Sequence, residues 1–238
     1  MPSWRWLNPC DRNLMDIVIP PTPLQQVRAA VKANLLPGLV LWCGLAVLVL
    51  AYAWSPTVQS GLAAWGRAKQ AGGYPFAFFS YAAFAVLVPE ALGQLLLKQP
   101  WRKTMWADMA YATLVFGCVG ITVDVFYVLQ VQLFGEGNDT ATIVKKMLVD
   151  QFIYSPITNF AVIALFAWRE DGYRASTWRR VVSADFLTTR YLPLMVALWC
   201  VWIPGVLAIY CMPTALQFPV ASLILSFWIL IFKFIRKG

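Results

Sequence analysis

Six long apolar stretches dominate the pattern of hydrophobic and polar positions along this chain. They cover Leu35–Trp54, Tyr74–Leu97, Met105–Phe134, Met147–Trp168, Tyr191–Tyr210 and Leu216–Phe232. Each has close to the roughly 20 residues that a helix needs to cross the hydrocarbon core of a bilayer. The pattern therefore predicts an all-α fold, a polytopic transmembrane helical bundle of about six membrane-spanning helices.

A more polar arm over residues 1–34 precedes the transmembrane helical domain, which we place at residues 35–238. Within the arm, Thr22-Pro23 is typical of a helix start, because the hydroxyl can cap the helix and Pro is favoured at its first position. We expect an interfacial N-terminal helix over Leu24–Leu36 that turns into the first span at Pro37-Gly38. The acidic residues Asp11 and Asp16 count against a cleavable targeting peptide in this arm.

Basic residues are divided unequally between alternate connections of the six runs. All but four of the 19 Lys and Arg residues lie in the N-terminal arm, the second and fourth connections and the C-terminal tail, and the exceptions are Arg67, Lys69, Lys145 and Lys146. Short basic segments stay on the cytoplasmic side of a membrane. The charges therefore predict both termini on the cytoplasmic or matrix-equivalent side of a bacterial inner membrane or an organellar membrane.

Composition agrees with a membrane protein and restricts its chemistry. Hydrophobic residues make up 60% of the chain and charged residues 13%, against about 25% charged residues in soluble domains. Basic residues stand beside Trp at predicted span ends, as at Trp101 and Trp168, so the net charge of +8 indicates lipid headgroups as partners and not nucleic acid. The chain has no His and no Cys-x-x-Cys pair, so we expect no metal site, no cofactor and no enzyme activity.

Polar residues and prolines at membrane depth are the candidate functional residues, because such side chains usually face the bundle interior or a wet cavity. Glu90 follows Pro89 in the second run, and Gln94 lies one turn later on the same face. Pro89 leaves the carbonyl of Ala85 without its helical donor and favours a kink. Asp124 lies well inside the third run. We expect Glu90, Gln94 and Asp124 either to line a pore or to form hydrogen bonds between helices.

Asp150 and Gln151, near the start of the fourth run, belong to the same candidate set. Asp150 either lines the pore or bonds between helices, or it serves as a negative charge near a helix N-terminus within one turn of Lys146. Pro156 and Pro204 are expected to kink the fourth and fifth helices. Such breaks are tolerated along a permeation route, where neighbouring helices or water take up the freed carbonyls.

One segment of the chain resembles a known family. Lys145-Lys146 followed by Asp150-Gln151, with Pro156 five residues later, is similar to the K-K-x-x-x-D-Q…P signature of the Mpv-seventeen/peroxisomal membrane protein family. Glu90 and Gln94 look like that family's Asp-x-x-x-Gln pair. Upstream of the signature, Gly120 and Phe126-Tyr127 look like its Gly-Pro…Trp-Tyr segment, with Ile121 in place of the Pro and Asp124 where a His is often found.

The resemblance covers roughly residues 89–232 and implies a bacterial-type or divergent member of the family. Its members are small multi-pass proteins of mitochondrial inner, peroxisomal and related membranes, usually described as having four helices. They are proposed to form weakly selective pores for small metabolites, which implies a permeability role here.

Two functions follow as alternatives. The first is a small-solute or metabolite channel of low selectivity, with Glu90, Gln94 and Asp124 facing the interior. The second is a non-transporting structural or scaffold membrane protein, whose polar residues hold helices together. An intramembrane enzyme is disfavoured because the chain lacks the usual general base. The expected partners are membrane lipids, a small metabolite or ion, and further copies of the chain.

Overall fold

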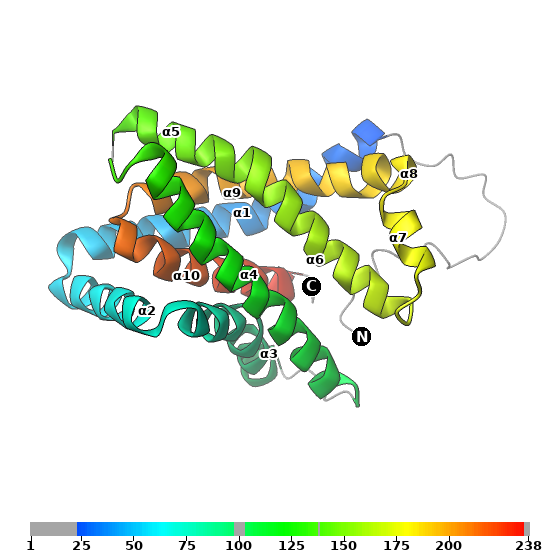
Figure 1. Cartoon of the computed structure of the whole chain (residues 1–238), viewed down its shortest axis with the longest axis horizontal. Coiled ribbons are helices and arrows are strands. Elements are labelled where there is room, and N and C mark those ends of the chain that lie inside the picture. Colours follow the sequence, from blue (N-terminus) through cyan, green and yellow to red (C-terminus); the bar gives the residue numbers. More distant parts are fainter. Residues whose placement is uncertain (1–22, 98–102, 138, 236–238) are drawn as a thin grey trace.

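The computed structural model describes residues 23–97, 103–137 and 139–235, and within these ranges the chain is helical and contains no strand (Figure 1). Long helical segments follow the six apolar runs. In chain order the elements are α1 (Pro23–Trp54), α2 (Pro56–Ala82), η2 (Ala83–Leu87), α3 (Val88–Leu97), α4 (Met105–Phe134), α5 (Thr140–Val149), η3 (Asp150–Tyr154), α6 (Ser155–Glu170), α7 (Ser176–Val181), α8 (Ala184–Phe186), η4 (Leu187–Tyr191), α9 (Leu192–Tyr210) and α10 (Thr214–Ile235).

Four of these helical segments are long and apolar enough to cross a membrane. They are Pro56–Leu95, Met105–Phe134, Thr140–Glu170 and Ala184–Tyr210. Two further apolar helices, Gly38–Trp54 and Thr214–Ser226, are shorter within the described residues. The all-helical fold and its apolar helices support an integral membrane protein, whereas the count of six spans stays a prediction.

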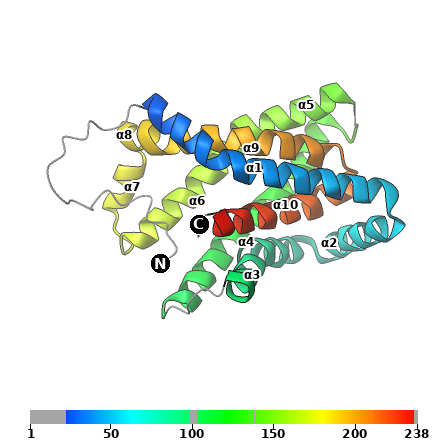
Figure 2. The same cartoon turned by 180° about the vertical axis from the view of Figure 1, so that it is seen from behind.

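Helix α1 covers Pro23–Trp54 of the described residues, and the expected turn at Pro37-Gly38 is absent because one helix continues to Trp54. Close packing on α9 accounts for the continuity, and Figure 2 shows the two helices side by side. A Cβ at Gly38 would lie 2.9 Å from Val201 Cγ2. The indole of Trp42 donates a hydrogen bond to the Val201 carbonyl at 3.0 Å. Residues 1–22 of the arm lie outside the described residues.

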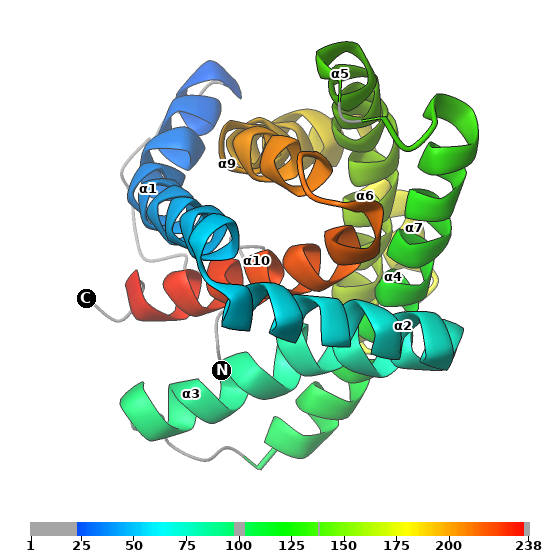
Figure 3. The ribbon, with the colours of Figure 1, turned by 90° about the vertical axis from the view of Figure 1, so that its left-hand side faces the viewer.

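Helix α10 is the central element of the bundle. It contacts α1, α2, α3, α4 and α9, and Figure 3 shows it between these helices when the molecule is viewed along its long axis. Every residue from Leu216 to Ser222 is buried. A helical segment that is buried all round forms the core of a bundle, so α1, α2, α3, α4 and α9 are arranged around this part of α10.

Helices α2 and α4 cross closely because α4 presents glycines at the contact. A Cβ at Gly120 would lie 2.6 Å from the Ala77 carbonyl oxygen and 2.4 Å from Tyr81 Cβ, and a Cβ at Gly117 would lie 2.4 Å from the Phe78 ring. Small residues at such crossings let two backbones approach within a bilayer, where packing replaces the hydrophobic effect as the driving force.

Within the described residues, three wide π-helical turns interrupt the long helices, and each ends two residues before a proline. The turns η2, η3 and η4 precede Pro89, Pro156 and Pro193. Proline has no N–H and its ring clashes with the carbonyl four residues back. The residue before each proline instead donates to a carbonyl five residues back, as Ser155 does to Asp150. Pro204 behaves differently, because α9 continues through it as an α-helix.

A break at Gly73 divides α2. Its φ of 54° and ψ of −141° are non-helical, and this region of backbone space is accessible mainly to glycine. The break separates a first segment that carries Arg67 and Lys69 from the apolar run that begins at Tyr74. The start of the second apolar run therefore coincides with a change of helix direction.

Candidate functional site

A buried polar cluster joins α4, η3 and α9, and we name its four residues, Gln130, Asp150, Gln151 and Tyr210, the Asp150 cluster. The Tyr210 hydroxyl donates to Asp150 Oδ2 at 2.6 Å, and Gln151 Nε2 donates to Asp150 Oδ1 at 2.9 Å. Gln130 Nε2 donates to the Tyr210 hydroxyl at 3.1 Å. All four side chains are buried. The cluster therefore links two sequence-predicted residues, Asp150 and Gln151, to two that sequence reasoning missed.

The backbone of η3 explains why Asp150 and Gln151 can face this cluster. In a π turn the N–H of residue 156 would donate to the Gln151 carbonyl, but residue 156 is proline. The indole N–H of Trp199 on α9 donates to that carbonyl at 2.8 Å instead. A neighbouring helix thus satisfies the group that the proline frees, as required in an apolar environment. Such π turns are frequent at functional sites.

Lys146 does not pair with Asp150, although the two residues are one turn apart. The structure gives no ion pair between them, and the donors to the carboxylate are Tyr210 and Gln151. Lys146 is only 2% exposed, and its carbonyl accepts a hydrogen bond from Gln130 Nε2 at 2.9 Å. The predicted Lys146–Asp150 contact is therefore absent.

A cleft of about 610 Å³ opens between α2, α4 and α10, and we name it the Lys69 cleft. Helix α2 contributes a basic and an amide side chain, α4 contributes an acid and several apolar residues, and the first turns of α10 close the far wall. The lining residues are Lys69, Gln70, Asp124, Tyr127, Val128, Val131, Gln132, Glu136, Thr214, Ala215 and Phe218. The cleft therefore places charged groups inside a largely apolar bundle.

An ion pair between Lys69 Nζ and Asp124 Oδ1 forms the charged wall of this cleft. The Asp124 side chain is 6% exposed, whereas that of Lys69 is 20% exposed. Because Lys69 comes just before the break at Gly73, α2 can bring a residue from the polar segment against an acid deep in α4. Asp124 was predicted as an interior acid without a basic partner, and Lys69 was expected in a connecting segment.

Tyr127 connects the cleft to the Asp150 cluster. Its side chain lines the cleft, and its ring packs edge-on against the Tyr210 ring with a centroid distance of 5.9 Å. One aromatic layer thus separates the ion pair from the buried carboxylate of Asp150.

Glu90 and Gln94 lie on α3 and are not part of the lining of the Lys69 cleft. Both are half-buried. The amide of Gln94 lies 3.7 Å from Met105 Sδ, at the start of α4. Their predicted role at a pore stays a prediction, and Pro89 beside them is fully buried.

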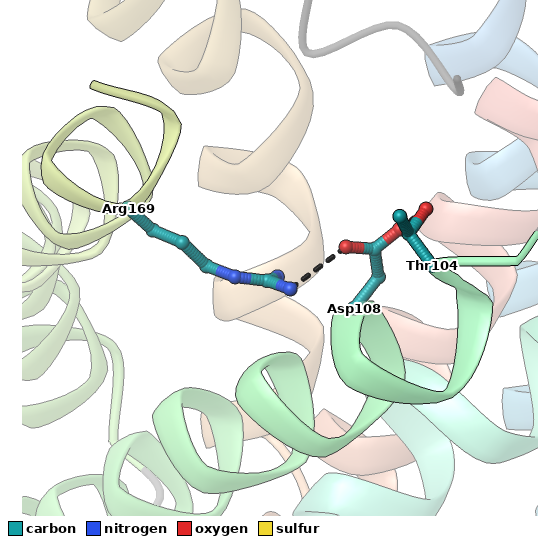
Figure 4. Close-up of polar contacts among 3 residues, drawn as sticks. All are labelled: Thr104, Asp108 and Arg169. Carbon is teal, nitrogen blue, oxygen red and sulfur yellow. Dashed lines mark hydrogen bonds and ion pairs between the residues drawn. The ribbon is translucent and has the colours of Figure 1, made fainter. Parts of the chain in front are cut away.

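A second polar contact ties the start of α4 to the end of α6 (Figure 4). Arg169 Nη2 donates to Asp108 Oδ1 at 2.8 Å, and the Thr104 hydroxyl donates to Asp108 Oδ2 at 3.1 Å. The Arg169 guanidinium also stands over the Tyr111 ring, 4.7 Å from its centroid. An acid in the first turn of one helix and a base in the last turn of another also suit the two helix dipoles.

The turn between α4 and α5 holds an exposed helix cap. Asp139 Oδ1 accepts the backbone N–H of Thr142 at 3.0 Å, and Asp139 Oδ2 accepts the Thr142 hydroxyl at 2.6 Å. These hydrogen bonds to the ionised form lower the pKa of Asp139. The carboxylate is thus a structural N-cap of α5.

Among the described residues, no group of three His, Cys, Asp or Glu side chains gathers closely enough to hold a metal ion. Comparison with known proteins finds no matching family model, no matching curated protein and no matching solved structure. The resemblance to the Mpv-seventeen/peroxisomal membrane protein family therefore stays a prediction from the motif residues.

Proposed function

We propose that this membrane protein is a channel of low selectivity, through which small solutes pass by way of the Lys69 cleft. The observation that carries the proposal is an ion pair, Lys69–Asp124, that forms a wall of a cleft of about 610 Å³ between apolar helices. Ionisable groups at membrane depth are costly and mark solute or ion pathways more often than they serve packing. A cleft of this size accepts molecules of the metabolite class.

The path beyond the cleft leads through Tyr127 toward the Asp150 cluster. Tyr127 is the aromatic layer between the two features. A solute that displaces Lys69 from Asp124 would meet this ring next. Rotation of the Tyr127 side chain would then connect the cleft with polar groups on α4, η3 and α9. In this proposal Glu90 and Gln94 act elsewhere on the route, near the interface of α3 and α4.

The proposed topology has six spans, with α1 and α10 crossing the membrane beside the four longer candidates. Both termini and the connection that holds α7 lie on the cytoplasmic or matrix-equivalent side. The support is the distribution of basic residues and the continuous helices α1 and α10. Single-cysteine variants Glu136→Cys and Arg179→Cys, in a background without the native cysteines, should react with an impermeant thiol reagent from opposite sides. Labelling from the same side would refute this topology.

The motif that resembles the Mpv-seventeen/peroxisomal membrane protein family supports the proposal in a second way. Asp150 and Gln151 lie in the π turn η3, which ends two residues before Pro156. The carbonyl of Lys146 belongs to the same hydrogen-bond network as these two side chains. Membership of that family is part of this proposal, and it agrees with a bacterial inner membrane or an organellar membrane as the location.

Flux through reconstituted vesicles tests the function. Vesicles that contain the protein should lose entrapped small sugars and amino acids faster than protein-free vesicles. Asp124→Asn should change that flux several-fold, because it removes the charge that holds Lys69 in the cleft. Asp185→Asn is the matched control, since Asp185 is exposed and does not line the cleft. Flux equal to that of protein-free vesicles for every solute would refute the proposal.

A scaffold function is the second candidate, and the Asp150 cluster favours it. Its hydrogen bonds join three helical segments, as expected if polar residues only hold the bundle together. A scaffold predicts that Asp150→Asn lowers stability in detergent while no solute passes through vesicles of the unmodified protein.

A further inference from the structure

The carboxylate of Asp150 is buried without a basic partner. Asp108, Asp124 and Asp171 each form an ion pair, whereas the described residues give none for Asp150. Asp150 is 6% exposed and receives its hydrogen bonds from a phenol and an amide, which are both neutral. An isolated carboxylate is strongly disfavoured in an apolar interior unless a positive charge compensates it. The Asp150 cluster therefore needs a compensating positive charge, which is either a proton on the carboxyl group or a bound cation.

Two buried amide oxygens in the same cluster have no hydrogen-bond partner. These are Gln130 Oε1 and Gln151 Oε1, and their side chains are 1% and 2% exposed. The amide orientations are fixed by the nitrogens. Gln130 Nε2 donates to the Lys146 carbonyl and the Tyr210 hydroxyl, and Gln151 Nε2 donates to Asp150. Each unpaired oxygen thus belongs to an amide that is already bonded into the cluster.

The set of atoms indicates the charge and the kind of ligand. A proton on Asp150 would supply one donor, whereas two amide oxygens need partners. A metal cation can bind several oxygens at once, and carboxylate, amide and hydroxyl oxygens are the ligands that hard cations prefer. One carboxylate balances one positive charge, which favours a monovalent ion over a divalent ion.

The position of the cluster in the fold agrees with an ion site. Asp150 and Gln151 occupy a π turn that interrupts the candidate span Thr140–Glu170. In membrane proteins, interrupted helices are where coupling ions meet freed backbone and side-chain oxygens. The Gln151 carbonyl already accepts a hydrogen bond from the Trp199 indole. The oxygens that remain for the ligand are therefore those of the Asp150, Gln130 and Gln151 side chains.

We propose that the Asp150 cluster binds one alkali-metal cation, held by the carboxylate of Asp150 and the side-chain oxygens of Gln130 and Gln151. The ion neutralises the buried carboxylate and fixes the relative positions of α4, η3 and α9. The site does not depend on solute passage through the Lys69 cleft, because a scaffold would need the same compensation.

Thermal unfolding of the full-length protein in detergent tests the site. Melting temperatures are measured in NaCl, KCl and choline chloride at equal ionic strength and fixed pH. At least one alkali salt should raise the melting temperature over choline in a saturable manner, since a ligand of the folded state stabilises by RT ln(1 + [L]/Kd). Equilibrium binding of the radioactive ion should then saturate at one cation per chain.

Variants separate this site from general salt effects. Asp150→Asn should abolish the difference between alkali and choline salts, and Gln151→Met should weaken ion binding at least several-fold while keeping the carboxylate. Asp124→Asn, the control at the other buried acid, should keep the full ion response. Gln151→Met serves as the test if Asp150→Asn does not fold. Equal melting temperatures in all three salts, an unchanged response in the Asp150 or Gln151 variant, or a response to pH alone would overturn the proposal.

Discussion

Replacing Tyr210 with Phe is the sharpest test of the Asp150 cluster, because it removes one oxygen atom from the centre of the network. The Tyr210 hydroxyl donates to Asp150 Oδ2 at 2.6 Å and accepts from Gln130 Nε2 at 3.1 Å. The residue is 1% exposed, so water does not replace the lost contacts. The ring contact with Tyr127 stays, because Phe keeps the aromatic ring.

The magnitude follows from the partners that remain. A hydrogen bond to a charged group contributes about 1.5–3 kcal/mol to stability. Asp150 keeps its donor Gln151, and Gln130 keeps its acceptor at the Lys146 carbonyl. No partner is therefore left wholly unsatisfied by the change. We expect Tyr210→Phe to lower the free energy of unfolding by about 2 kcal/mol.

The assay is reversible unfolding of the purified protein in mild detergent titrated with a denaturing detergent. Tyr74→Phe is the matched control, because Tyr74 is 56% exposed and no hydrogen bond is recorded for its hydroxyl among the described residues. The control should change stability by less than about 0.5 kcal/mol. A double-mutant cycle of Tyr210→Phe with Asp150→Asn should give a coupling energy of about 1 kcal/mol or more. If Tyr210→Phe costs no more than Tyr74→Phe, the hydroxyl does not hold the carboxylate, and the inferred network is wrong.

Three further predictions address packing, a surface ion pair and a helix cap. Gly120→Ala should destabilise by about 1–3 kcal/mol in the same assay, because the new Cβ meets the Ala77 carbonyl and Tyr81; Gly61→Ala, which meets nothing within 4 Å, should be neutral or stabilising. Arg169→Met should cost about 1 kcal/mol at low salt, and less at high salt, because its pair with Asp108 is partly exposed. The pKa of Asp139 is lowered in the folded protein, so its stabilisation is present above the unfolded pKa of about 3.9 and is lost as pH falls through the folded value. Asp139→Asn should therefore flatten the acid limb of the stability–pH curve, and an unchanged limb would contradict this assignment.

The hydrophobic pattern was sufficient to predict the helical fold, because apolar runs of roughly 20 residues are typical of helices that span a membrane. The break at Gly73 falls immediately before the predicted run that starts at Tyr74. The predicted helix start at Thr22-Pro23 stays a prediction, because Thr22 lies outside the described residues. The turn predicted at Pro37-Gly38 is wrong, because α1 packs on α9 at Gly38 and continues as one helix to Trp54.

Pairing between distant side chains was not predictable in the same way. Lys69 was assigned to a connecting segment by its charge, yet it pairs with Asp124 on α4. A hydropathy pattern describes positions along the chain, and it does not show which helices pack side by side. It therefore could not show that α2 brings Lys69 next to Asp124 on α4. Tyr210 and Gln130 were missed for a related reason, since a single Tyr or Gln in an apolar run gives no sign of its partner. Gln130, a polar residue within the third run, could have joined the candidate set by its position alone, as Asp124 did.

The effect of each proline on its helix could not be predicted from the sequence alone. Losing an N–H at Pro156 and at Pro204 is the same local change, and both residues were predicted to kink their helices. A π turn precedes Pro156, whereas α9 passes Pro204 without one. At Pro156 the indole of Trp199, on another helix, donates to the Gln151 carbonyl that the widened turn would leave free. This hydrogen bond satisfies a carbonyl that would otherwise be unpaired in an apolar bundle. The site around Asp150 is therefore fixed jointly by a proline in one helix and a tryptophan in another, and their meeting is a property of the fold.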